Sequence, residues 1–364
     1  MSARWVFVIE CHRRIDRFNV ADEPMKTLDW NLSNATLLWF FPAIWIVPMQ
    51  TRDEHAYLKL CAEVFEQPPC DNRTATKTRR VFARQLKFAL HDPVRGPLMP
   101  LLTSKRVNWR AVYIEAVWFL KGLTNNNWLK SRGVNIWNGN STREFLDQRG
   151  LDYPEGELGP VYGSQWNNWN NTGINQLEQA LRLLKTDPFS RRNIVSAWNV
   201  EKLSAMALPP CHYCFQFIVG DGARGAKPVL NCIVNMRSAD LVLGVPFNIA
   251  SYAFITHLFA SAASMTPGTL VINMADCHIY ENHEPARAML TRNIRASPEF
   301  RWRGPFNEIS DILGKFNDTA IDAIEAIDDI AGDAIDAIDA IDAIDAVNIV
   351  RYVPHKFIKL PMAI

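Results

Sequence analysis

The sequence lacks the charge imbalance and the long apolar runs that mark many nucleic-acid-binding and membrane proteins. Its 364 residues carry a formal net charge of only +1. No overall field therefore attracts nucleic acid or an acidic membrane, and any anion binding must depend on local basic residues. The apolar stretch 37–47 is interrupted by Pro42 and is roughly half the ~20 residues needed to span a bilayer. We expect it to be a hairpin or a core segment, with no membrane as a partner.

The sequence also lacks a disulfide framework and a metal-binding pattern. It has seven cysteines, an odd number, and the only C-x-x-C pair is Cys211 with Cys214. No second pair and no nearby His-x-x-x-His accompanies it, so no metal is expected. The apolar residues 5–9 are followed at once by charged residues, without a small-residue cleavage site, which argues against a signal peptide. We expect reduced thiols and a cytoplasmic location.

Hydrophobic residues make up 48% of the chain, enough for a large core. A helix is expected to begin near Asp53, where acidic residues stand in its first turn. Periodicity predicts further helices over 109–120, 175–185 and 247–263, and strands over 81–90, 194–198, 215–219 and 229–235. This mixture predicts an α+β fold, a single large domain with a mixed β-sheet flanked by helices.

One segment fits neither a helix nor a strand. From about 319 to 347 the chain repeats Ala-Ile-Asp, with a period of three residues and no basic side chain. A helix advances 3.6 residues per turn and a strand alternates every two, so the isoleucines would form no apolar face. We interpret the segment as a low-complexity acidic insertion in a loop. A helix docked on the core is the alternative.

Cys211 has neighbours along the sequence that suggest chemistry. It lies in Leu-Pro-Pro-Cys-His, and the chain continues to Arg237-Ser238-Ala239-Asp240 and to Asn248 within Pro-Phe-Asn-Ile-Ala. An arginine can stabilise a thiolate, and an asparagine amide can read the polar edge of a ring. The combination predicts covalent catalysis on a pyrimidine nucleotide. A buried structural cysteine is the alternative.

These motifs resemble those of the thymidylate synthase family, from about residue 53 to 308 and again over the last dozen residues. The motifs are Asn72-Arg73-Thr74, Glu115-Ala116-Val117-Trp118-Phe119, Ile136-Trp137, Gly159-Pro160-Val161-Tyr162-Gly163, Ser190-Arg191-Arg192 with Trp198-Asn199, Pro210-Cys211-His212, Arg237 to Ala250, and Asp276-Cys277-His278-Ile279-Tyr280 with Asn282-His283. The resemblance implies that 51–364 is the catalytic domain and that 1–50 is an N-terminal extension. It implies a homodimer packed sheet to sheet. It also implies a methyltransferase that converts dUMP and 5,10-methylenetetrahydrofolate, a co-substrate, to dTMP and dihydrofolate.

The resemblance assigns the phosphate of dUMP to several arginines. It implies contacts from Arg73, Arg237 and Ser238 of one subunit and from Arg191 and Arg192 of the other, and it adds Gln216 to the substrate contacts. Taken alone, the adjacent pair 191–192 would indicate a solvated surface. The family loop has glycines after Arg-Thr where this chain has Ala75 and Lys77. We expect a reshaped loop, because glycine permits backbone shapes that other residues resist.

Three side chains are expected to recognise the base and the sugar. An asparagine amide can donate to the uracil carbonyl and accept from the ring N–H, so Asn248 suits uracil, whereas an aspartate would suit cytosine. The alternative for Asn248 is a structural cap of the helix that starts near 247. The resemblance gives His278 and Tyr280 to the sugar hydroxyl. Their alternative is a pair of side chains satisfied in the core.

A further set of residues is expected to transfer protons and to bind the folate. The resemblance places Glu115, Tyr162 and His212 in a network around the pyrimidine, and a structural salt bridge is the alternative for Glu115. It gives Lys105, Trp137, Asp240 and Ala363 to the folate, with Trp137 and Asp240 also among the catalytic residues. Asn138 stands where the family usually has aspartate. The terminal apolar residues 362–364 are expected to act as a lid.

Two other functions stay open from the sequence. The first is a phage-type hydroxymethylase acting on dUMP, and less favourably on dCMP because Asn248 suits uracil. Asn235-Met236 before Arg237, where synthases usually have Tyr-Gln, keeps this alternative open. The second, of another class, is a non-catalytic relative that binds nucleotide or RNA. The full set of catalytic residues argues against the second, and nucleic acid is not expected as an obligatory partner.

Overall fold

The computed structural model of the protein describes residues 49–302, 311 and 347–361. The predicted N-terminal extension, the apolar stretch 37–47, almost all of the Ala-Ile-Asp insertion and the tail with Ala363 lie outside the described residues. Within the described part of the chain, no helix is long and apolar enough to cross a bilayer.

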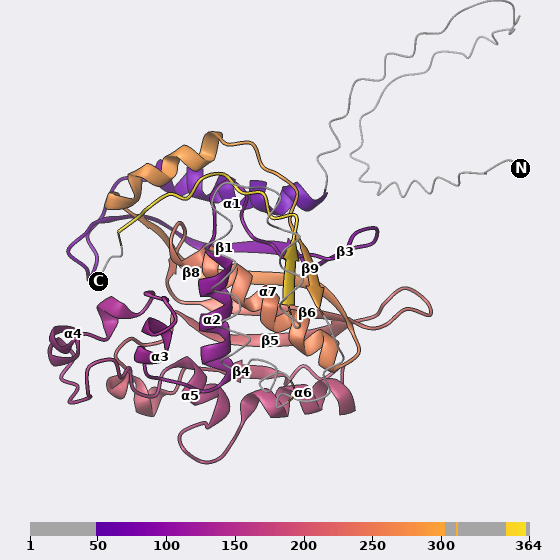
Figure 1. Ribbon diagram of the computed structural model, residues 1–364, viewed down its shortest axis with the longest axis horizontal. Coiled ribbons are helices and arrows are strands. Elements are labelled where there is room, and N and C mark those ends of the chain that lie inside the picture. The colour runs from indigo at the N-terminus through magenta and orange to yellow at the C-terminus, as the bar shows by residue number, and fades with distance from the viewer. Residues whose placement is uncertain (1–48, 303–310, 312–346, 362–364) are drawn as a thin grey trace, which may run out of the picture. The chain divides into compact units, whose positions relative to one another are not determined.

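A six-stranded mixed sheet forms the centre of the described domain (Figure 1). Its strands are β1 (Thr78–Ala89), β4 (Ile194–Ser196), β5 (His212–Gly220), β6 (Val229–Met236), β7 (Ala239–Asp240) and β8 (Thr266–Tyr280). They lie in the order β1-β8-β6-β5-β4, and β7 pairs with β8. The β6–β8 and β7–β8 pairs are parallel and the other pairs are antiparallel. The predicted mixed sheet with helices is thus confirmed.

Helices and short strands complete the domain. The helices are α1 (Met49–Phe65), α2 (Trp109–Leu120), α3 (Asn127–Lys130), α4 (Arg143–Gln148), α5 (Tyr162–Asn167), α6 (Gln176–Thr186), α7 (Gly244–Ala262) and the 3₁₀ helices η1 (Asn138–Asn140), η2 (Val200–Ala205) and η3 (Glu281–Thr291). The short strands are β2 (His91–Asp92), β3 (Gly96–Pro97), β9 (Glu299–Trp302) and β10 (Val347–Val350). α7 packs against α2, β6, β7 and β8. Its apolar side chains are buried nearly all round, as the sequence predicts.

Helix starts follow the local sequence. The side chain of Asn108 accepts a hydrogen bond from the backbone of Ala111 at 3.0 Å, so α2 begins where its amides have a partner. α7 begins at Gly244, before the predicted start, and its N-cap residue is Leu243, which makes no side-chain cap. Asn248 therefore lies inside the helix, and the alternative that it caps the helix is wrong.

The sequence pattern does not predict β8, although this strand pairs with β1, β6 and β7 within the sheet. Pro267 and Gly268 near its start resemble a turn, and the polar residues near its end disturb the apolar alternation. Its burial alternates at 270, 272 and 274, but after the exposed Ala275 three consecutive residues, 277–279, are buried. On the neighbouring β1, Ala83 has a φ of 53° at the same level. This kink leaves the polar residues at the end of β8 free to line a cavity.

Candidate active site

A cavity of about 460 Å³ opens where α2, α5, α7 and the ends of β5, β6 and β8 meet. Its lining combines segments that are far apart in the sequence. Twelve of the residues predicted from the sequence line it: Arg73, Glu115, Trp137, Tyr162, Cys211, His212, Arg237, Ser238, Asp240, Asn248, His278 and Tyr280. The fold therefore brings most of the predicted site together in one chain.

Cys211 stands immediately before β5, at the centre of this cavity wall. Its backbone N–H donates to the Tyr162 hydroxyl at 2.7 Å, and its Sγ lies 3.8 Å from Nη2 of Arg237. Arg237 is held by the carbonyls of Pro209 and Pro210, at 2.7 and 2.9 Å. Burial raises the pKa of the Cys211 thiol, while the charges of Arg237 and Arg73 act to lower it. Arg237 thus lies where the sequence predicts, but burial outweighs its effect.

An aromatic cluster includes His212, which follows the cysteine in the chain, and Tyr162, which contacts its backbone. The His212 ring stacks on Tyr162 with centroids 4.2 Å apart, and its Nδ1 is 2.8 Å from the hydroxyl of Tyr252. Burial lowers the pKa of His212 to about 3, so its ring is neutral near pH ~7. Burial also raises the pKa of Tyr162 well above its ordinary value. Both groups therefore hold fixed protonation states and can relay a proton only through hydrogen bonds.

Glu115 is the exception among these buried groups. It lies on α2, and its carboxylate accepts a hydrogen bond from Nε1 of Trp137 at 2.8 Å. Burial raises the pKa of Glu115 to about 7, although the Trp137 hydrogen bond opposes the shift. Among the described residues its partner is an indole rather than a basic side chain. Glu115 can therefore gain or lose a proton near neutral pH.

The loop that carries Arg73 is shaped by its neighbour Asn72. Oδ1 of Asn72 accepts from the backbone and the hydroxyl of Thr74, both at 2.7 Å, and its Nδ2 donates to the Thr76 carbonyl at 2.8 Å. Among the described residues with positive φ, neither Ala75 nor Lys77 appears. The loop thus closes without the backbone freedom of glycine. Lys77 lies 3.5 Å from Asp71 on the surface and is not part of the cavity lining.

Four of the predicted site residues that the structure describes do not line this cavity. Arg191 and Arg192 are exposed in the turn between α6 and β4. Gln216 on β5 donates to the Arg191 carbonyl at 2.8 Å, so it belongs to this edge of the sheet. Lys105 is buried and donates to the Val242 carbonyl, behind the cavity wall, and burial lowers its pKa to about 8. Ala363 lies outside the described residues.

The structure adds residues that the sequence analysis leaves without a role. Asp276 and Arg80 line the cavity next to His278. His283, which is fully buried, pairs through Nε2 with the Pro361 carbonyl at 2.7 Å, and its Nδ1 lies 3.8 Å from Asp240. Asp276 and His283 stand inside motifs that the family resemblance includes, whereas Arg80 could be found only from its register opposite His278.

Asn138 is explained by its amide neighbours. Its Nδ2 donates to Oδ1 of Asn135 at 2.8 Å, and its Oδ1 accepts from Nδ2 of Asn126 at 3.0 Å. An aspartate could accept but could not donate, so an amide suits this position, beside Trp137.

In the part of the chain that the structure describes, no cluster of three or more His, Cys, Asp or Glu could hold a metal ion.

Comparison with known proteins gives one consistent result. The family model described as thymidylate synthase matches residues 55–364. The thymidylate synthase of Saccharomyces cerevisiae is 40% identical over 291 residues, covering 75% of this chain and 94% of that protein. A thymidylate synthase of Agaricus bisporus is 41% identical over 286 residues, with 74% and 95% covered. A probable thymidylate synthase of Schizosaccharomyces pombe is 43% identical over 276 residues, 71% of this chain and 44% of that protein.

Proposed function

The chain belongs to the thymidylate synthase family, and from this premise we propose that Cys211 is the nucleophile with which it makes dTMP from dUMP. The chain has thymidylate synthase activity, and the family uses a methylenetetrahydrofolate. In the proposed reaction, Sγ of Cys211 bonds to carbon 6 of the uracil, so carbon 5 becomes nucleophilic toward the one-carbon unit. The proton on carbon 5 is then lost, the folate supplies both the new carbon and a hydride and leaves as dihydrofolate, and the bond between Sγ and carbon 6 breaks to release Cys211.

The position of Cys211 is the observation that carries this proposal. Its Sγ lies beside Arg237, in the wall of a cavity that also holds the predicted contacts for the nucleotide. The thiol is protonated before the reaction because burial raises its pKa. Arg237 is placed to stabilise the thiolate as the proton leaves.

Proton transfer is assigned to the buried groups. Glu115, with a pKa near neutrality, is the group that takes up and returns a proton at the pyrimidine. His212 stays neutral and orders its neighbours through hydrogen bonds. Tyr162, which already accepts the backbone N–H of Cys211, lies close enough to the nucleophile to assist removal of the proton at carbon 5.

The remaining cavity residues select and hold the ligands. We assign the uracil edge to Asn248, the sugar hydroxyl to His278 and Tyr280, and the phosphate to Arg73, Arg237 and Ser238. Trp137 and Asp240 are assigned to the folate, and Trp137, buried against Tyr162, would exclude water from the reacting carbon. Lys105 would support this wall from behind.

We further propose a homodimer, packed sheet to sheet, in which Arg191 and Arg192 complete the phosphate site of the partner subunit. Both arginines are exposed at the β4 edge, and neither lines the cavity of its own chain. A dianionic phosphate needs several fixed donors, so a site lacking these arginines would be incomplete. Gln216 holds the turn that carries them.

A pair of cysteine variants tests the nucleophile. Cys211→Ser should abolish turnover and formation of a covalent protein–nucleotide adduct, with dUMP affinity retained within about tenfold, because a serine hydroxyl is not ionised near pH ~7. Cys214→Ser is the matched control, since Cys214 lies outside the cavity lining beside Asn235. Mass analysis of the product from dUMP should show a methyl group. A hydroxymethyl product, or a Cys211→Ser enzyme with more than about a tenth of the wild-type rate, would contradict the proposal.

A further inference from the structure

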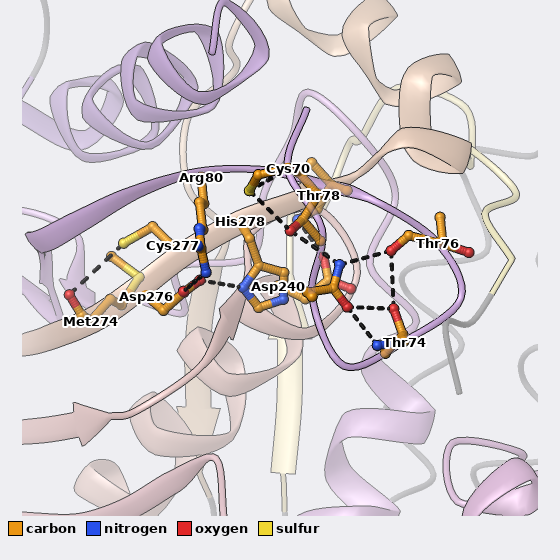
Figure 2. Close-up of polar contacts among 12 residues, drawn as sticks. Cys70, Thr74, Thr76, Thr78, Arg80, Asp240, Met274, Asp276, Cys277 and His278 are labelled. Atoms are coloured by element: carbon orange, nitrogen blue, oxygen red, sulfur yellow. Dashed lines mark hydrogen bonds and ion pairs between the residues drawn. The ribbon is translucent and has the colours of Figure 1, made fainter. Parts of the chain in front are cut away.

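Asp276 is a carboxylate in the cavity wall that has no part in the reaction described above. One of its oxygens is 2.9 Å from Nδ1 of His278, and the other is 3.4 Å from Nη1 of Arg80. Figure 2 shows the carboxylate between these two side chains. All three residues line the cavity. We propose that the Arg80–Asp276 ion pair is a positioning unit, which orients His278 toward the sugar hydroxyl of dUMP.

The pairing of two strands builds this arrangement. In the antiparallel β1–β8 pair, Arg80 stands opposite His278 and Phe82 stands opposite Asp276. Opposite residues of neighbouring strands share one face of a sheet, as do alternate residues of one strand. The guanidinium of Arg80 also lies 5.4 Å from the centroid of the Phe82 ring. Arg80 is therefore held on two sides, and its charge is directed at Asp276.

The chemistry of the carboxylate fixes the hydrogen of the imidazole ring. An ionised carboxylate can only accept hydrogen bonds, so Nδ1 of His278 must donate to it. Burial acts to raise the pKa of Asp276, but the hydrogen bond and the electrostatic attraction of His278, together with the charge of Arg80, outweigh it and lower that pKa below its ordinary value. Asp276 is thus ionised at neutral pH. In the neutral ring Nε2 is then an acceptor, which suits a hydroxyl group that donates.

This inference rests on the proposed function, because it takes the assignment of the sugar hydroxyl to His278 as its starting point. In dUMP the only free hydroxyl of the sugar is the one on carbon 3. Neither Arg80 nor Asp276 need touch the substrate, so both would act through His278. A different role for Arg80, as a third arginine of the cavity wall that contacts the phosphate, predicts a different pattern of losses.

Three ligands separate these roles by calorimetry. They are dUMP, 2′,3′-dideoxyuridine 5′-monophosphate, which lacks the sugar hydroxyl, and deoxyuridine, which lacks the phosphate. Asp276→Asn should weaken dUMP binding about tenfold, since one hydrogen bond to the hydroxyl is lost or misdirected, and should change binding of the dideoxy nucleotide by less than about twofold. Arg80→Gln should weaken dUMP binding by less than Asp276→Asn does, again with little change for the dideoxy nucleotide. Arg80→Lys should restore most of the lost affinity. In a His278→Ala background, Asp276→Asn should cause no further loss.

The dideoxy nucleotide also reports whether each variant still has a folded cavity. Equal losses for both nucleotides in Asp276→Asn would show that Asp276 only supports the wall, and would overturn the inference. Losses in Arg80→Gln for both nucleotides but not for deoxyuridine would assign Arg80 to the phosphate and would also overturn it. Failure of the wild-type protein to bind dUMP would instead contradict the proposed function.

Discussion

Parts of the proposed site lie in two different environments, the buried floor of the cavity and the exposed β4 edge of the sheet. On the floor, Glu115, Tyr162 and His212 are buried, and burial shifts the pKa of each. At the edge, Arg191 and Arg192 are exposed. Burial brings the pKa of Glu115 to the working pH, whereas it fixes the protonation states of Tyr162 and His212. Arginines that bind a phosphate must stay charged, and exposure to solvent avoids the free-energy cost of burying that charge.

In the proposed dimer, one chain would hold the groups that transfer protons and its partner would supply part of the positive charge around the phosphate. The cavity lining already includes Arg73, Arg80 and Arg237, yet Arg80 is engaged with Asp276 and Arg237 with two backbone carbonyls. In that dimer, Arg191 and Arg192 are the donors that the partner subunit supplies. Four substitution experiments test this division between the cavity floor and the β4 edge, and their expected effects decrease in the order given below.

The largest effect is expected from the edge. Replacing both Arg191 and Arg192 with alanine should raise KM for dUMP by about a hundredfold or more, since two charge-assisted donors are lost. Mixing this variant with Cys211→Ser should restore part of the activity, because one of the two sites in each hybrid dimer is intact. Steady-state kinetics after subunit exchange measures both effects. Absence of rescue, with exchange confirmed, would place the arginines in the site of their own chain.

On the floor, Glu115→Gln should increase stability while lowering activity. The folded-state pKa of Glu115 is raised from 4.5 to about 7, so the stability it supports below about pH 4.5 is lost as the pH rises through about 7. At about pH 8 the glutamine variant should therefore be more stable by about 3 kcal/mol, and the difference should vanish below about pH 4.5. Denaturant unfolding at both pH values is the measurement. The exposed Glu155→Gln serves as the control, and a pH-independent difference would refute the assignment.

A change of base preference is expected to be smaller. Asn248→Asp should shift the ratio of dUMP to dCMP affinity toward dCMP by roughly tenfold to a hundredfold, because a carboxyl group suits the cytosine edge better than an amide does. Competition binding of the two nucleotides gives the ratio directly. An unchanged ratio would show that Asn248, although it lines the cavity, does not read the base.

The smallest effect is expected from the exposed pair of Lys77 and Asp71 on the loop that carries Arg73. Lys77→Ala should change KM for dUMP by less than about twofold, since solvent-exposed ion pairs contribute little. Arg73→Ala on the same loop is the matched contrast and should cost about tenfold or more. Similar losses from both variants would mean that Lys77 also reaches the phosphate.

The sequence predicts the helices and strands of this fold better than the places where they pack together. α2 has the predicted bounds because a marked helix start and an apolar run agree there. β8 is not predicted, because the alternation of its buried positions ends at Met274 and gives way to a continuous buried run at 277–279, which breaks the pattern on which a strand prediction depends. The motifs predict Cys211 and Asn248 as site residues, and both line the cavity. The motifs cannot show that Lys105 lies behind the cavity wall or that Gln216 faces the β4 edge. They also cannot show that burial outweighs Arg237 in setting the pKa of the Cys211 thiol. Each of these depends on packing.

The contact between His283 and the Pro361 carbonyl has a consequence for the folding of the domain. The two residues are 78 positions apart, so forming this hydrogen bond closes a long loop and costs chain entropy. Contacts between residues far apart in the sequence form more slowly than local ones. We therefore expect this hydrogen bond to form after the local helices and hairpins, so the buried face of His283 is covered late in folding.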